Sequence, residues 1–369
     1  MTNYDYLQNL TDLRRKFHVF PEIAYKEVQT QAKIITELDK MGVSYEKVGT
    51  GVIAKINMGK QKTIAFRADI DALPINEIND VPYKSQNPGF MHACGHDGHI
   101  ALLLTFIKYC TLNPDKMGNN AVFIFQPAEE AEGGAIKMIE YGAIDEVDEI
   151  YAIHVDPQLP EGTAGLKDGV SMAGAYEFDI EIIGESCHCA EKQLGKDALH
   201  ALTGVIENAY SEISKLKTKS LFHCGKLCGG YARNIVADRM SANCTIRYFQ
   251  EKDLDNILTI INTKLKQAEE LFGVKCEIKL LTNYIPLVNN SECNQKVKKY
   301  IKTAELPLRF SAEDFAFYLK EIKGCIIWLG TKDGAVVKKL HSPDFDFNEK
   351  ALLHGLELYK QLIKENING

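Results

Sequence analysis

The nine residues Met91–His99, MHACGHDGH, constrain the fold of this chain more than any other segment. They place a cysteine, three histidines and an aspartate in one turn punctuated by Gly95 and Gly98. Such a cluster is costly to bury for packing alone, because buried polar groups without partners destabilise a protein. One divalent metal ion would satisfy several of them, and thiolate with imidazole suits zinc and related transition metals. The alternative at this point is a solvated, histidine-rich loop.

Length and composition narrow the class of protein. A chain of 369 residues predicts two domains, and 45% hydrophobic with 25% charged residues is typical of a soluble globular protein. The net charge of −7 argues against nucleic acid as a partner, since phosphate binding favours a basic face. The ten cysteines are scattered, and we see neither a signal segment nor an apolar run long enough to cross a bilayer. We therefore expect a cytoplasmic protein with reduced thiols and no membrane association.

Two carboxylates follow a predicted strand at residues 63–68. Asp69 and Asp71 stand at i and i+2, so on an extended chain they point the same way. Strand ends are where α/β sheets present functional groups, and these carboxylates could bind metal or orient ligand histidines. The alternative is an acidic turn before Pro74.

A second pair of carboxylates, Glu129 and Glu130, follows the apolar strand predicted at Ala121–Phe125. Adjacent side chains can take different tasks, one binding metal and the other acting as the general base of metal-assisted hydrolysis. An acidic helix start is the simpler interpretation, because carboxylates complement the helix dipole. It does not explain the flanking Pro-Ala and Gly-Gly residues.

Three further histidines need separate interpretation. His154 ends a predicted strand at Glu149–Val155, and His341 stands in a late LHSPDF segment. A single histidine on an apolar strand is usually a core residue, but His154 is the third potential ligand at a third strand end. His18 stands alone beside a helix break, so we interpret it as structural.

The pattern changes near Gly174, where polar and apolar residues begin to alternate as in a half-buried antiparallel strand. We expect an inserted α+β domain over residues 174–283, with the catalytic domain formed by residues 1–173 and 284–369. The inserted domain is predicted to have the order βαββαβ. Its strands are expected at 177–183, 234–236, 241–248 and 275–282, and its helices at 197–216 and 254–271.

Six motifs, in chain order, resemble those of the aminoacylase/hippurate-hydrolase branch of the dinuclear metallo-amidohydrolases. Within that branch the likeness is nearest to the N-acetyldiaminopimelate deacetylases, and it extends over nearly the whole chain. It implies an α/β zinc-peptidase-like catalytic domain with a mixed sheet, interrupted by a lid and dimerisation domain. The motifs are FRADIDALP, MHACGHDGH, FQPAEE, the strand ending at His154, SAEDF and LHSPDF.

The resemblance also implies roles for residues of the catalytic domain. Glu129 matches the general base, and Asp71, with Asp69, matches the acidic motif beside the site. Two divalent ions, of zinc, manganese, cobalt or nickel, are implied. Their ligands would be Cys94, as the bridging group, with His96, Glu130, His154 and His341.

For the lid, the resemblance implies a homodimer in which His188 reaches the partner subunit's active site and stabilises the oxyanion. Asn234 and Arg247 match residues that hold the substrate carboxylate. Cys187 and Cys189 beside His188 depart from the Gly-Gly-His-Ala-Ala usual in the family, which leaves the acyl preference open.

The implied activity is metal-dependent hydrolysis of the amide bond of a small N-acyl amino acid. The first substrate is N-acetyl-L,L-diaminopimelate, cleaved to L,L-diaminopimelate and acetate in lysine biosynthesis. Alternatives are a broad aminoacylase or hippurate-type hydrolase, a dipeptidase, a cysteine-nucleophile hydrolase using Cys94, and a non-catalytic binding module.

Overall fold

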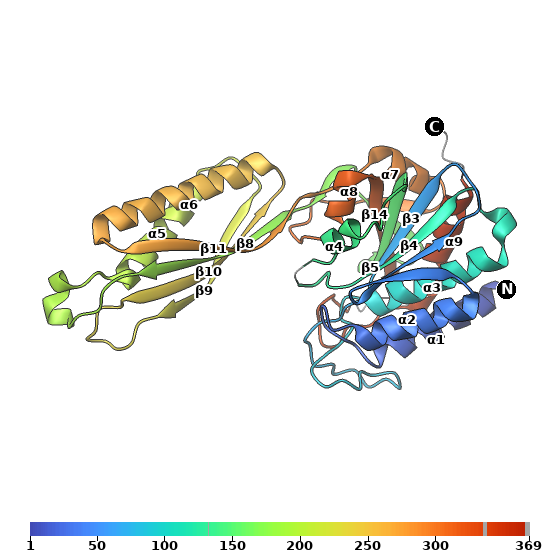
Figure 1. Ribbon diagram of the computed structural model, residues 1–369, viewed down its shortest axis with the longest axis horizontal. Coiled ribbons are helices and arrows are strands. Elements are labelled where there is room, and N and C mark those ends of the chain that lie inside the picture. The colour runs from blue at the N-terminus through green and yellow to red at the C-terminus, as the bar shows by residue number, and fades with distance from the viewer. Residues whose placement is uncertain (132, 335–337, 366–369) are drawn as a thin grey trace. The chain divides into compact units, whose positions relative to one another are not determined.

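The computed structural model describes residues 1–131, 133–334 and 338–365, and its chain forms two compact units (Figure 1). Unit 1 comprises Met1–Ser171, Val288–Pro307 and Asp314–Gly369, and unit 2 comprises Met172–Leu287 and Leu308–Glu313. The lid predicted at residues 174–283 falls inside unit 2. The short return of the chain at 308–313 has no counterpart in that prediction.

Unit 1 is built on one eight-stranded sheet with the order β1-β2-β4-β3-β5-β14-β6-β13. Its strands are β1 (Ser44–Val48), β2 (Gly51–Ile56), β3 (Thr63–Asp69), β4 (Asn120–Gln126), β5 (Glu149–Pro160), β6 (Thr163–Leu166), β13 (Lys302–Glu305) and β14 (Lys323–Lys332). Strand β3 runs parallel to β4 and β5, and β5 runs parallel to β14, whereas β2 is antiparallel to both β1 and β4. The expected mixed sheet is confirmed.

Helices cover both faces of this sheet. In Figure 1, α4 and α8 lie on the side of the sheet away from α1, α2 and α3. The helices of unit 1 are α1 (Asn3–His18), α2 (Val28–Met41), α3 (His96–Leu112), α4 (Ala135–Glu140), α7 (Ser291–Lys298), α8 (Ala316–Glu321) and α9 (Leu352–Lys364), with 3₁₀ turns at Pro114–Lys116 and Glu349–Ala351.

Helix α3 is the central element of the unit 1 core. Its sequence is apolar on nearly every side, so it is stable only when surrounded, and it packs between α1, α2 and α9 and the strands β3 and β5. Buried aromatic rings join the layers, with Phe66 of β3 against Phe106 of α3 and Tyr359 of α9. The first turn of α3, which carries the histidine-rich motif, is thereby held at the sheet.

Unit 2 is an α+β domain with a four-stranded antiparallel sheet in the order β11-β8-β10-β9 and two helices that pack on one another (Figure 1). Its elements are β8 (Gly174–Ile183), a 3₁₀ turn (Cys189–Leu194), α5 (Ala198–Ile213), β9 (Leu221–Gly229), β10 (Arg239–Tyr248), α6 (Glu251–Phe272) and β11 (Lys275–Tyr284). Two short strands, β7 (Gly169–Met172) and β12 (Leu287–Asn289), form a separate pair.

One strand of unit 2 was predicted at the wrong place. The strand expected at residues 234–236 is a turn with an isolated bridge at Ile235, and the first of the two strands between the helices is β9 instead. β9 is an edge strand that is exposed over most of its length, so its sequence carries no apolar alternation. Among the described residues, no helix is both long and apolar enough to span a membrane.

Candidate metal centre and active site

The carboxyl ends of parallel strands carry the polar side chains of the site. Asp69, the last residue of β3, pairs with Gln126, the last residue of β4, while His154 of β5 lies opposite Trp328 of β14. Parallel neighbours present their carboxyl ends at one edge, where open α/β sheets bind ligands. The rings of His154 and Trp328 have centroids 4.5 Å apart, which restricts rotation of the imidazole.

Two glycines let α3 begin directly against this edge. Gly95, at the helix start, has φ +88°, and a Cβ atom there would lie 2.4 Å from Cγ2 of Val155. A Cβ atom on Gly98 would lie 2.6 Å from the Phe347 ring. Because real Cβ atoms do not tolerate such distances, glycine at both positions is what allows His96 to enter the site.

The structure brings together the five side chains that the family resemblance implies as metal ligands. Sγ of Cys94 lies 3.4 Å from Nε2 of His154 and 3.3 Å from Nε2 of His341. Oε1 of Glu130 lies 3.2 Å from Nε2 of His341 and 3.9 Å from Nε2 of His96. Two ligand triads result, Cys94–His96–His154 and Cys94–Glu130–His341, and Cys94 belongs to both.

The chemistry of this cluster fits cations. Nε2 of His96 and Oε1 of Glu130 are buried and have no hydrogen-bond partner among the described residues. Burial, followed by the nearby carboxylates of Glu130 and Glu129, raises the pKa of the Cys94 thiol well above its usual value. A thiol surrounded by carboxylates becomes a thiolate when a metal ion supplies positive charge. Sulfur, imidazole and carboxylate together suit Zn²⁺, Mn²⁺, Co²⁺ or Ni²⁺.

Asp71 holds two of the candidate ligands in place. Its backbone carbonyl lies 2.9 Å from Nδ1 of His96, and its Oδ2 accepts a 3.0 Å hydrogen bond from the Glu130 backbone N–H. A carbonyl at Nδ1 leaves Nε2 of His96 available toward the cluster. Asp71 therefore acts on the site through its neighbours, which makes it a positioning residue.

Asp69 and His99 form a second support. Nδ1 of His99 lies 2.6 Å from Oδ1 of Asp69, and Nε2 of His99 accepts a 3.0 Å hydrogen bond from the Val155 backbone N–H. This contact fixes the strand residue next to His154. His99 was not predicted to have a role, although its spacing of three residues from His96 places both on one face of α3.

Arg67 and Asp314 were also missed. Arg67 is buried and donates to Gln126 at 2.9 Å, Asp69 at 2.7 Å and Asp314 at 2.9 Å. Asp314 in turn accepts from the backbone N–H of Ala135 at 3.0 Å. The available signal was an arginine inside an otherwise buried strand, because a buried guanidinium requires anionic partners.

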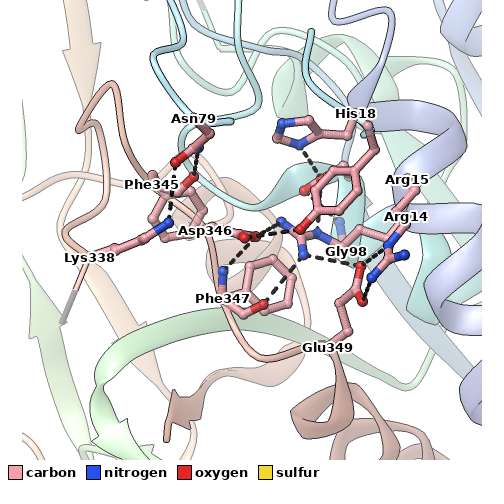
Figure 2. A network of polar contacts seen from close by, with 12 residues as sticks. Arg14, Arg15, His18, Asn79, Gly98, Lys338, Phe345, Asp346, Phe347 and Glu349 are labelled. Atoms are coloured by element: carbon pink, nitrogen blue, oxygen red, sulfur yellow. Dashed lines mark hydrogen bonds and ion pairs between the residues drawn. The ribbon is translucent and has the colours of Figure 1, made fainter. Parts of the chain in front are cut away.

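His18 lies in a buried ionic network around Arg14, which Figure 2 shows. Nδ1 of His18 lies 2.7 Å from Oδ2 of Asp97, and Nε of Arg14 donates to the same oxygen at 3.2 Å. Arg14 also donates to Asp346 at 2.6 Å and to Glu349 at 3.2 Å. The network anchors the first turn of α3 to α1 and to the C-terminal segment. His18 contacts no candidate ligand side chain in the described part of the chain, as its structural interpretation predicts.

The three remaining site candidates lie in unit 2. His188 and Asn234 are exposed and close in space, because His188 bridges to Ile235 and the Cys189 N–H donates to the Asn234 carbonyl at 3.0 Å. Arg247 lies far from this pair. It is opposite Ala175 at the start of β8, whereas His188 follows the end of β8, roughly 25 Å along the strand. Within one subunit these residues do not form one small site.

Comparison with known proteins agrees with this architecture. The family description for peptidase family M20/M25/M40 matches residues 65–365. This chain belongs to the M20 peptidase family. A hydrolase of Staphylococcus haemolyticus is 38% identical to this M20 protein over 375 residues, which cover 97% of this chain and 98% of that one.

Two solved structures extend the comparison. A crystal structure from methicillin-resistant Staphylococcus aureus has a TM-score of 0.93 at 28% identity and covers 100% of this M20 chain and 98% of its own. The YXEP protein of Bacillus subtilis, described as a dinuclear metal-binding peptidase from the M20 family, has a TM-score of 0.85 at 29% identity, with 98% of both chains covered. The fold of this M20 protein is therefore shared over its whole length.

Proposed function

We propose that this M20 family member is a dinuclear metal-dependent amidohydrolase that removes the acyl group from N-acyl amino acids. The observation that carries the proposal is the position of Cys94, whose sulfur is common to two ligand triads. A sulfur atom shared in this way can bridge two ions. The similarity to YXEP, a dinuclear metal-binding peptidase, supports the same number of ions.

In this proposal Cys94, His96 and His154 hold one ion, and Cys94, Glu130 and His341 hold the other. When bound, such ions polarise a substrate carbonyl and make hydroxide available near neutral pH. The sequence and the ligand set leave Zn²⁺, Mn²⁺, Co²⁺ and Ni²⁺ as the candidates.

Glu129 is proposed as the general base. It is adjacent to Glu130, and oxygens of both carboxylates lie within 4.8 Å of each other and of a His96 nitrogen. A carboxylate at this position can accept a proton from the attacking water at an Oε atom and deliver it to the leaving amine. The side chain is buried, with 8% of its surface exposed, which strengthens its interaction with developing charge.

For the lid we propose that His188 donates a hydrogen bond to the carbonyl oxygen as negative charge develops there, in the partner subunit's active site. Asn234 and Arg247 would hold the substrate carboxylate, for which a guanidinium is well suited. The distance between His188 and Arg247 along β8 supports a site completed by two copies of the chain, since one small substrate cannot reach both within one lid.

The first candidate substrate is N-acetyl-L,L-diaminopimelate, which would place the enzyme in cytoplasmic lysine biosynthesis. A broad aminoacylase or hippurate-type hydrolase uses the same catalytic groups. A dipeptidase is the second candidate function, because YXEP is described as a peptidase. A non-catalytic binding module has no use for the complete set of ligands together with Glu129.

The test is a deacylation screen by release of free amine. Metal-stripped protein is reloaded separately with Mn²⁺, Co²⁺, Zn²⁺ and Ni²⁺ and offered N-acetyl-L,L-diaminopimelate, N-acetyl and N-benzoyl amino acids, and dipeptides. We expect turnover that a chelator abolishes and metal restores. Activity that resists chelation but is lost on thiol alkylation would instead favour a cysteine nucleophile. Folded, metal-loaded protein that is silent with every substrate would favour the binding module.

A further inference from the structure

Backbone strain in this protein gathers at the proposed active site. Among the described residues, four that are not glycine have positive φ, and three of them, Tyr25, Ala128 and His341, lie in or beside the site. Ala128, with φ +56°, immediately precedes Glu129. A left-handed residue with a side chain is unfavourable by itself, so its surroundings must impose that conformation.

The conformation of Ala128 matters because of where the next two side chains point. Adjacent side chains of an extended strand point to opposite faces. Glu129 and Glu130 instead both reach His96, because the chain leaves β4 at Gln126 and turns at Ala128. The two carboxylates can therefore serve one site only while this turn is maintained.

The carboxylate of Glu27 maintains the turn. Its Oε1 accepts a 2.9 Å hydrogen bond from the Ala128 backbone N–H, and its Oε2 accepts a 2.6 Å hydrogen bond from the Thr50 hydroxyl. Glu27 is completely buried, and burial raises the pKa of its carboxyl group. A buried carboxylate is costly unless it is well hydrogen-bonded. The hydrogen bond from the Ala128 N–H therefore stabilises both the Glu27 carboxylate and the strained backbone at Ala128.

A second contact comes from the same segment. The Tyr25 hydroxyl donates to the Gly133 carbonyl at 3.2 Å, and the Gly133 N–H donates back to the Ala128 carbonyl at 3.0 Å. Tyr25 itself has φ +58°. The segment between α1 and α2 thus contacts both Ala128, through Glu27, and Gly133, through Tyr25.

We propose that Glu27 is a positioning residue that holds Ala128 in its left-handed conformation and so aims the Glu129 carboxylate for proton transfer. This inference rests on the proposed function, since it assumes that Glu129 is the base. Glu27 touches neither substrate nor metal in this scheme and acts through the Ala128 backbone.

The test compares Glu27→Ala with Glu27→Gln in the metal-loaded enzyme. The glutamine carbonyl can still accept from Ala128, and its amide can donate to the Thr50 oxygen. We expect Glu27→Ala to lower kcat about 10- to 100-fold with KM and metal content unchanged, because small misplacement of a catalytic group has effects of this size. Glu27→Gln should recover most of kcat. Wild-type kcat in Glu27→Ala would overturn the proposal.

Glu22→Ala is the matched control. Glu22 is a carboxylate of the same segment, and it accepts hydrogen bonds from the backbone N–H groups of Gln29 and Thr30 in α2. Its loss should lower the unfolding temperature without changing kcat. If Glu22→Ala and Glu27→Ala lower kcat equally, Glu27 has only a general structural role and the proposal is wrong.

Two further variants separate this proposal from the proposed function. Adding Ala128→Gly to Glu27→Ala should raise kcat at least about fivefold, because glycine adopts positive φ without strain. Hydrogen exchange needs no substrate: the Ala128 amide should exchange at least about tenfold faster in Glu27→Ala than in wild type or Glu22→Ala. Unchanged exchange would refute the role of Glu27 in holding Ala128, even if the enzyme is active. Full activity of Glu129→Gln would refute Glu129 as the base. It would not affect the hydrogen-exchange test of the contact between Glu27 and Ala128.

Discussion

The Sγ atom of Cys94 lies 3.3 Å from Nε2 of His341, although the two residues are 247 positions apart in the chain. His341 has φ +62°, and its backbone N–H donates to the Ala93 carbonyl at 2.8 Å, directly beside Cys94. A left-handed residue other than glycine costs on the order of 1–3 kcal/mol. This cost falls where a histidine near the C-terminus contacts the two residues, Ala93 and Cys94, that lie just before α3.

Replacing Cys94 tests whether the two ligand triads share one sulfur. We expect Cys94→Ala to reduce the bound metal to at most one ion per chain and to lower turnover at least about 100-fold, because both triads lose a ligand. Metal content after gel filtration measures this directly. Cys110→Ala is the matched control, since Cys110 is also a buried thiol but lies in α3 away from the candidate ligands. Two ions retained in Cys94→Ala would contradict the bridging role.

Replacing Glu129 tests the base. Glu129→Gln keeps the shape of the side chain but cannot accept a proton, so we expect both metal ions to remain and kcat to fall about 10²- to 10⁴-fold. Metal analysis and steady-state kinetics on the same sample separate the two effects. Near-normal turnover would refute the role of Glu129 in proton transfer.

Replacing His188 tests whether a lid histidine stabilises the oxyanion in the partner subunit's active site. His188→Ala should lower kcat about 10²- to 10³-fold if the imidazole stabilises the oxyanion. Mixed dimers of Glu129→Gln and His188→Ala subunits should regain activity, because one of the two sites then has both an intact base and an intact histidine. Mass spectrometry establishes that mixed dimers have formed. Their complete inactivity would contradict a histidine supplied by the partner.

The ionic network at His18 predicts a dependence of stability on pH. Burial alone would lower the pKa of His18, but hydrogen bonds to Asp97 and Glu77 raise it to about 9. The folded pKa lies above the unfolded value near 6.5, so this stabilisation is complete below about pH 6.5 and is lost as pH rises through 9. It amounts to something on the order of 3 kcal/mol.

Denaturant unfolding of wild type and His18→Gln at equal metal content measures this effect. The difference in unfolding free energy between the two proteins should shrink as pH rises from 6 to 9.5. His223→Gln, which replaces an exposed histidine of β9 outside the network, is the control. A constant difference for His18→Gln would show that folding does not change the pKa of His18, and would contradict the stabilisation argued here.

Much of the catalytic unit could be predicted because its signals are local. An apolar run followed at once by a carboxylate marks the end of β3 at Asp69, and neighbouring parallel strands bring such ends together. His154 was predicted at the end of a strand, but β5 continues beyond it to Pro160. The mixed sheet was implied by the family resemblance, and the βαββαβ order of unit 2 was predicted from polar–apolar alternation and helix-like stretches. Strand β9 was not, since an exposed edge strand is under little pressure to alternate.

The chain by itself determined which chemistry is available: a thiol, imidazoles and paired carboxylates, each in a short motif that can be recognised from neighbouring residues. Only the tertiary structure decided which buried charges support them. Arg67 meets Asp314, and Glu27 meets Ala128, across gaps of 247 and 101 residues. Such pairs leave no periodic trace in the sequence, because a buried charge needs a partner close in space and has no preference for where along the chain it comes from.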